Sequence, residues 1–225
     1  KTTLAEDYFC YRLATDPDYR IMVGCEAQQL AQKILTRVKQ RMEESGPFPK
    51  FVEQFGPFIP QNMDGRASRQ VWSANAFNVY KRQAYDERDF SMAGIGFGSN
   101  IVGTRTDHLH CDDLQSTKTI SQTEKMFDTF RQDWLSRPGE SGITTINGTR
   151  VADGDLYEKL EDEYGGEDFF HIVRLPAIVR NHVTGEDEPL WPYDPNAKHA
   201  VKGWTMEMLD RQRKKVGEDA WARNW

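Results

Sequence analysis

Short apolar runs alternate along the chain with longer segments in which apolar residues recur every three or four positions. The helical spacing predicts helices over residues 3–14, 26–44, 121–135, 153–163 and 205–216. The short runs predict strands over residues 20–25, 71–83, 90–97, 107–111, 142–148 and 169–173. Because strands alternate with helices, the pattern favours an α/β fold with a mostly parallel sheet flanked by helices.

Three of the predicted helices rest on apolar residues that recur at helical spacing and so fall on one side of the helix. These residues are Leu4, Tyr8 and Tyr11 in the first helix, Leu30, Ile34, Val38 and Met42 in the second, and Met126, Phe127, Phe130 and Trp134 in the third.

Two stretches depart from this pattern and indicate the domain organisation. Residues 46–70 are rich in proline and glycine and are expected to form an irregular excursion. After Pro176 the sequence becomes loop-like over residues 181–198 before the last predicted helix, which is strongly charged. We therefore predict a sheet-based core over residues 1–176 and a small lid or linker subdomain over residues 177–225.

Composition adds limits on the class of protein. Hydrophobic residues make up 38% of the 225 positions, which is enough for a buried core, and no apolar run approaches the length of a membrane span. The first residues carry charges where a signal peptide would be apolar, and the three cysteines are scattered, which fits free thiols in a reducing cytoplasm. The net charge of -6 argues mildly against a surface that grips DNA everywhere, although one basic patch would suffice for a ring motor.

The chain opens with Lys1 and Thr2, which lead directly into a predicted helix. In a P-loop, a lysine at the helix N-terminus reaches the β and γ phosphates, the next hydroxyl binds Mg²⁺, and backbone N–H groups cradle the anion. The glycines of such a loop are not in this sequence, so a chance pair is the default interpretation of these two residues taken alone.

Asp112 and Asp113 follow a predicted strand and form the second candidate feature. A Walker B site needs one carboxylate at the end of a strand to hold Mg²⁺ and a second one beside it to polarise the attacking water. Paired aspartates also occur in ordinary turns and caps, which is the commoner explanation of such a pair. A metal site that includes His108, His110 and Cys111 is disfavoured, because the two histidines share one face of the strand and the cysteine lies on the other.

Two further segments carry candidate residues. A predicted strand ends near Gly148 and Thr149, where a polar group beside the Walker B strand could sense the γ-phosphate, and Asp153 is expected to cap the helix that follows. Arg105 lies just before the Walker B strand and could reach a phosphate of its own or a neighbouring subunit as an arginine finger. A capped turn and a plain surface charge are the ordinary alternatives for these two segments.

In their order and spacing, these segments together resemble the large terminase family of tailed bacteriophages. GTRTDHLHCDDLQS resembles the Walker B region of that family, and KTTLAEDYFCYRLATDPDYRIMVGC resembles the stretch that runs from the P-loop lysine to the next strand. INGTRVADGDLYEKL resembles the coupling segment, while LPAI, LWP and WTMEMLDRQRKKVGEDAWARNW resemble the lid. The resemblance covers nearly the whole chain.

The resemblance implies a P-loop ATPase of the RecA-like, additional-strand type that hydrolyses ATP with Mg²⁺ and moves double-stranded viral DNA into a procapsid. The roles that it implies are phosphate binding by Lys1 and Thr2, Mg²⁺ binding by Thr2 and Asp112, catalysis by Asp113, coupling by Gly148 and Thr149, and a trans-acting finger at Arg105. The partners that it implies are DNA, the portal protein, the small terminase subunit and further copies in a ring, with no membrane, in the host cytoplasm. It also implies that the glycine-rich half of the P-loop would precede Lys1 and that a nuclease domain would follow the lid.

Two other functions remain open at this stage. One is another P-loop NTPase, such as a superfamily-2-like helicase, although the helicase motifs that follow the first core are not found here. The other is a non-enzymatic remnant or assembly subunit that has kept the fold without the nucleotide site. Nucleotide binding by a chain that carries the upstream loop would separate an enzyme from a remnant.

Overall fold

A computed structural model of the chain describes residues 1–60, 71–84, 88–99, 101, 103–166, 169–197 and 202–224. Packing divides the chain into two compact units, Lys1–Gly148 and Thr149–Trp225. The first unit contains the sheet, and the second contains the segments that follow it. The predicted boundary between a core over residues 1–176 and a lid over residues 177–225 rests on a change in sequence character and stays a prediction.

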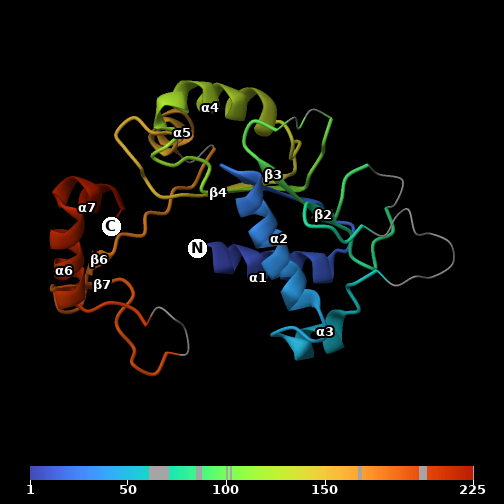
Figure 1. Ribbon diagram of the computed structural model, residues 1–225, viewed down its shortest axis with the longest axis horizontal. Helices are drawn as coiled ribbons and strands as arrows, with labels where there is room; N and C mark the ends of the chain where they lie inside the picture. The colour runs from blue at the N-terminus through green and yellow to red at the C-terminus, as the bar shows by residue number, and fades with distance from the viewer. Residues whose placement is uncertain are drawn as a thin grey trace. The chain divides into compact units, whose positions relative to one another are not determined.

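The first unit is built on a five-stranded sheet with the order β2-β3-β1-β4-β5 (Figure 1). Its strands are β1 (Ile21–Cys25), β2 (Ala76–Phe77), β3 (Met92–Gly96), β4 (His108–Asp112) and β5 (Ile143–Asn147). All neighbouring pairs are parallel except β2 and β3, which are antiparallel. The chain is therefore a mixed α/β protein with a mostly parallel central sheet, as the alternation of strands and helices predicts, and it is compatible with an α/β nucleotide-binding fold.

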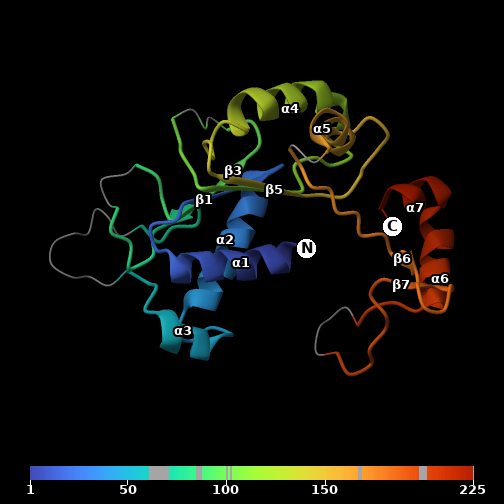
Figure 2. The same ribbon diagram turned by 180° about the vertical axis from the view of Figure 1, so that it is seen from behind.

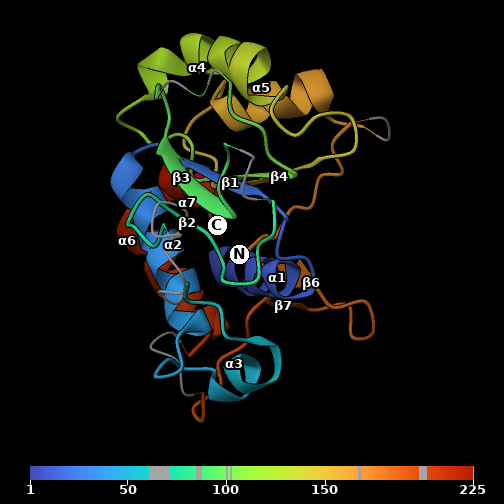
Figure 3. The same cartoon turned by 90° about the vertical axis from the view of Figure 1, so that its right-hand side faces the viewer.

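Helices cover both faces of this sheet, as Figures 1 and 3 show. The helices α1 (Thr2–Thr15) and α2 (Gln28–Met42) lie on one face, and the short α3 (Pro49–Phe55) packs against α2. The helix α4 (Thr123–Thr129), continued by a π-helical turn over Phe130–Trp134, lies on the other face. The main apolar core lies between the sheet and α1 and α2.

The sheet register decides which strand residues share a face. Ile21 of β1 lies opposite Met92 of β3 and His108 of β4. These three side chains, and every second residue that follows them along each strand, therefore point to the same side of the sheet. On the other side, a Cβ atom added at Gly24 would overlap the indole ring of Trp134, which is fully buried. The absence of a side chain at Gly24 is therefore what lets the helical layer approach β1.

Replacing Gly24 by alanine is expected to lower the free energy of unfolding by about 3 kcal/mol, because overpacking a filled core costs about 1–3 kcal/mol and the indole has no room to move. Urea unfolding would measure the loss. Gly94→Ala in β3 is the matched control, since its new Cβ would lie 3.1 Å from the side chains of Ala31 and Leu35, so those neighbours would need to move by only a few tenths of an ångström. Equal losses in the two variants would contradict this explanation.

The first predicted helix forms as α1, but its buried face is not the one that carries the recurring apolar residues. Leu4, Tyr8 and Tyr11 are exposed, and α1 instead buries the face that carries Glu6 and Phe9. The carboxylate of Glu6 is completely buried. The guanidinium groups of Arg37 and Arg41 on α2 lie 2.7 and 2.8 Å from its two oxygens and balance its charge. A charged residue in the middle of the buried face made that face look polar in the sequence.

Several other predicted elements also need correction. The strand expected over 71–83 is reduced to the two residues of β2, and the excursion expected over 46–70 contains α3, while its residues 61–70 lie outside the described part of the chain. No strand forms over the described residues 169–173, where the side chains are largely exposed. In α2 the apolar stripe is buried from Ile34 onward, but Leu30 is exposed.

The second unit contains α5 (Leu156–Tyr164), a hairpin of β6 (Ile178–Arg180) and β7 (Asp187–Pro189), and the helices α6 (Met206–Val216) and α7 (Glu218–Asn224). Figure 2 shows this hairpin and the two C-terminal helices from behind. A small core of Ala177, Leu209 and Trp221 joins them. The sequence pattern does not predict the hairpin, because residues 181–198 are loop-like.

The cap of α5 is Asp155 and not the predicted Asp153. The side chain of Asp155 is completely buried and accepts a hydrogen bond from the backbone N–H of Glu158. Arg150 pairs with Asp155 at 3.0 Å and with Glu158 at 2.6 Å, so the turn before the helix is tied to its first turn.

Within the described ranges, no helix has the length and apolar character that crossing a membrane would require.

Candidate nucleotide site at the carboxyl edge of the sheet

Five of the residues predicted to form the site lie together at the carboxyl ends of β4 and β5. The Nζ atom of Lys1 donates a hydrogen bond of 2.7 Å to the backbone oxygen of Gly148. The Oγ1 atom of Thr2 lies 3.1 and 3.0 Å from the two carboxylate oxygens of Asp112. Asp113 follows directly. The N-terminus of α1 therefore meets the ends of two adjacent parallel strands, the place where open α/β sheets bind ligands.

Asp112 is the last residue of β4, and only 8% of it is exposed. Burial by itself raises the pKa of Asp112, but the neighbouring His110 and the side chains of Thr2 and Asn147 outweigh it and hold the pKa below its usual value. Asp112 therefore carries a negative charge at neutral pH although it is buried. Such a carboxylate beside a hydroxyl is a suitable pair of oxygen ligands for Mg²⁺.

Asp113 has a backbone conformation that side-chain-bearing residues rarely adopt, with a φ of 46°. Two backbone hydrogen bonds hold it there: its N–H donates to the oxygen of Asn147 at 3.0 Å, and its oxygen accepts from the N–H of Glu26 at 3.1 Å. Desolvation raises the pKa of Asp113, the charge of Asp112 raises it further, and Lys1 opposes both. The two adjacent aspartates therefore differ, since Asp112 is the weaker base and Asp113 the better proton acceptor.

Glu26 is a third carboxylate at this edge, and the sequence pattern indicates only that it begins a helix. It directly follows β1, and its Oε1 accepts hydrogen bonds from Ser116 at 2.7 Å and Thr119 at 2.9 Å. These bonds tie the loop that follows Asp113 to the end of the central strand. Its position at the carboxyl end of a buried strand is the signal that could have identified it.

His108 and His110 lie on the face of β4 that α1 covers, and both are almost completely buried. Both rings contact the Oγ1 atom of Thr145 on β5, at 2.8 and 2.7 Å. Among the described residues there is no group of three or more histidine, cysteine, aspartate or glutamate side chains arranged to hold a metal. Burial lowers the pKa of His108 to about 4, with smaller contributions from His110 and Arg12, so His108 is neutral at neutral pH.

The low pKa of His108 predicts a loss of stability in mild acid. Because His108 binds a proton near pH 6.5 when unfolded and near pH 4 when folded, stability is complete above pH 6.5 and falls as the pH drops toward 4. The loss over this range is expected to approach about 3 kcal/mol. Urea unfolding at several pH values should show a shallower decline for His108→Gln than for the unmodified chain. His182→Gln, at an exposed site, is the control, and equal slopes for all three would contradict the prediction.

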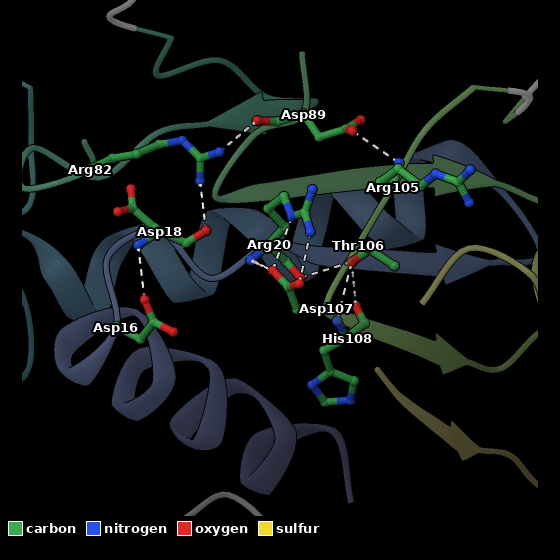
Figure 4. Close-up of polar contacts among 9 residues, drawn as sticks. All are labelled: Asp16, Asp18, Arg20, Arg82, Asp89, Arg105, Thr106, Asp107 and His108. Carbon is green, nitrogen blue, oxygen red and sulfur yellow. Dashed lines mark hydrogen bonds and ion pairs between the residues drawn. The ribbon is translucent and has the colours of Figure 1, made fainter. Parts of the chain in front are cut away.

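Arg105 does not join the other predicted residues. It precedes β4 and lies at the opposite edge of the sheet, separated from Asp112 by the length of the strand, roughly 15 Å. Figure 4 shows how its backbone is fixed: its N–H donates to Asp89 at 2.9 Å, beside the bidentate pair of Arg20 and Asp107. Arg105 is exposed, and within the described part of the chain its guanidinium makes no hydrogen bond or ion pair.

Thr149, the remaining predicted residue, is exposed and directly follows Gly148 as the first residue of the second unit.

No protein-family model matches the chain, and a search of curated proteins finds no match to it. The mixed α/β fold thus rests on the structure, while the terminase resemblance rests on the sequence motifs and stays a prediction. What the structure adds is the placement of the motif residues relative to one another within the first unit.

Proposed function

We propose that the first unit is the ATPase core of a large-terminase-like motor, which binds Mg–ATP at the carboxyl edge of the sheet and hydrolyses it. The observation that carries this proposal is the contact between Thr2 at the start of α1 and Asp112 at the end of β4. A P-loop ATPase requires this pairing of a helix-terminal hydroxyl with a strand-terminal carboxylate, and two sequence segments 110 residues apart supply it. A chance Lys-Thr pair would have no reason to lie against the paired aspartates.

In this proposal each residue has a role that its position supports. Lys1 would move from the oxygen of Gly148 to the β and γ phosphates, and backbone N–H groups at the start of α1 would bind the same anion. Thr2 and Asp112 would hold Mg²⁺, whose chemistry is to bridge the phosphates and neutralise their charge. Asp113, held rigidly and with a raised pKa, would accept a proton from the attacking water.

Two further roles depend on motion and on neighbouring copies. Gly148 contacts Lys1 and leads directly into the second unit through Thr149, so this pair would transmit the loss of the γ-phosphate to that unit. Arg105, being at the far edge, would serve the site of a neighbouring subunit in a ring and not its own. The work done would be the translocation of double-stranded DNA, with the portal protein and the small terminase subunit as the further partners that the resemblance implies.

The Mg²⁺ dependence of ATP hydrolysis by the full-length protein tests this proposal. Asp112→Asn is expected to raise the Mg²⁺ concentration needed for half-maximal activity by about tenfold or more, because it removes the charged oxygen ligand. The control is Asp128→Asn, which changes an exposed aspartate on α4 and should leave the requirement unchanged. If Asp112→Asn needs no more Mg²⁺ than the control, Asp112 is not a metal ligand. If no variant hydrolyses or binds ATP, the chain is a non-catalytic relative of the fold.

A further inference from the structure

A buried polar chain leads to Asp112 from inside the protein. His108 and His110 are on β4, and the hydroxyl of Thr145, opposite His110 on β5, lies between their rings. The free ends of the chain are His108 Nδ1 and His110 Nε2, which are buried and have no hydrogen-bond partner among the described residues. His110 Nε2 is directed at Asp112, 3.8 Å from its Oδ1 atom.

The hydroxyl of Thr145 has one hydrogen and two lone pairs, so at most one of the two rings can accept a hydrogen bond from it. If both rings are neutral, at least one of them therefore donates to Thr145. If His110 donated, its bare Nε2 lone pair would face the negative carboxylate of Asp112, whatever His108 did. If His108 then accepted from Thr145, it would also bury an N–H without an acceptor, and if His108 donated too, the hydrogen of Thr145 would have neither ring as its acceptor. These consequences are unfavourable.

The opposite arrangement avoids these penalties. His108 donates from Nε2 to Thr145, and the hydroxyl of Thr145 donates to Nδ1 of His110. The proton of His110 is then on Nε2, where it points toward the negative oxygen of Asp112. Only one bare lone pair, on His108 Nδ1, remains unpartnered in the apolar surroundings of Phe9.

We propose that His110, held as its Nε2–H tautomer by Thr145 and His108, is a positioning residue that orients the carboxylate of Asp112 for a divalent cation. Thr2 contacts Asp112 from the helix side and His110 approaches it from within the sheet, so two groups from different elements restrict its rotation. Side chains that hydrogen-bond a ligating carboxylate commonly change metal affinity or activity by about 10–100-fold when they are removed. At 3.8 Å the contact is longer than a hydrogen bond, and catalytic contacts of this kind shorten when the complex forms.

This inference rests on the proposed function, because it needs Asp112 to be a metal ligand. The tautomer itself does not, and it can be measured separately. In protein labelled with ¹⁵N at histidine, the ring nitrogens of His110 should show a protonated Nε2 and a bare Nδ1, and His108 should show the same tautomer. A proton on Nδ1 of His110 would overturn the inference and leave the proposed function untouched.

The functional part is tested with a pair of variants at Thr145. Thr145→Val removes the hydroxyl with little change in shape, and Thr145→Ser restores it. We expect Thr145→Val to raise the Mg²⁺ concentration for half-maximal ATP hydrolysis by about tenfold, and Thr145→Ser to return it close to the original value. Thermal unfolding of both variants would show that the fold is intact.

The outcomes of the Thr145 experiment separate the two claims. If Thr145→Val raises the Mg²⁺ requirement and Thr145→Ser does not, the positioning role is supported. If Thr145→Val has the unmodified requirement while Asp112→Asn shows a raised one, the positioning role is wrong and the proposed function stands. If neither Asp112→Asn nor Thr145→Val changes the requirement, both the proposed metal site and the positioning role are wrong.

Discussion

Asp113→Asn is expected to lower the rate of ATP hydrolysis by about 10²–10⁴-fold, the usual contribution of a positioned general base, while ATP binding stays largely intact. The substitution removes the proton-accepting oxygen and little else. Asparagine tolerates the left-handed backbone that Asp113 adopts, so the hydrogen bonds of that residue to Asn147 and Glu26 should persist. Single-turnover hydrolysis and calorimetric ATP binding would measure the two effects separately.

Two comparisons make this expectation specific. Asp113→Ala should lose as much activity but should also disturb the turn, because alanine tolerates a φ of 46° poorly. Asp128→Asn, on the exposed side of α4, should keep the original rate. Turnover close to the original in Asp113→Asn would remove the catalytic role of Asp113, whatever the result at Asp112.

Arg105→Ala is expected to lower hydrolysis by about 10³-fold or more if Arg105 acts as a trans-acting finger. Because Arg105 and Asp113 lie at opposite edges of the sheet, one subunit would supply the arginine and its neighbour the rest of the site. Mixing Arg105→Ala subunits with Asp113→Asn subunits should therefore restore part of the activity, since some interfaces then combine an intact arginine with an intact aspartate. Steady-state hydrolysis at a series of mixing ratios would measure this.

The control for this experiment is Arg131→Ala, which removes an arginine that pairs with Asp128 on the surface of α4. It should be as active as the unmodified protein at every mixing ratio. If mixtures of Arg105→Ala and Asp113→Asn subunits stay as inactive as each variant alone, Arg105 does not act across an interface. Because Arg105 is also too far from Asp112 to act in the site of its own subunit, it would then have no role in hydrolysis.

The parts of the fold that could be predicted are those in which apolar residues alone decide the outcome. The strand β1 is a continuous apolar run, and α2 buries Ile34, Val38 and Met42 as their spacing indicates. The buried face of α1 could not be found in this way, because Glu6 contributes to the core through its pairing with Arg37 and Arg41. Local patterns contain no information on a partner that lies on another helix.

The candidate site could be predicted in part, for a reason of topology. Asp112 ends one strand and Gly148 follows the next, and parallel neighbours bring such residues to one edge. The position of Arg105 could not be derived from its closeness in sequence to Asp112, because a strand carries the chain to the far edge. The joint contact of His108 and His110 with Thr145 depends on the register between β4 and β5, which the sequence does not reveal.

The central claim is that a nucleotide binds with its phosphates between Lys1 and the paired aspartates. A structure of the full-length protein with Mg²⁺ and a non-hydrolysable ATP analogue tests it most directly. We predict the β and γ phosphates at Lys1 Nζ, the metal next to Thr2 and Asp112, and Asp113 facing the γ-phosphate. A nucleotide bound elsewhere on the sheet, or one bound here without metal near Asp112, would contradict the account.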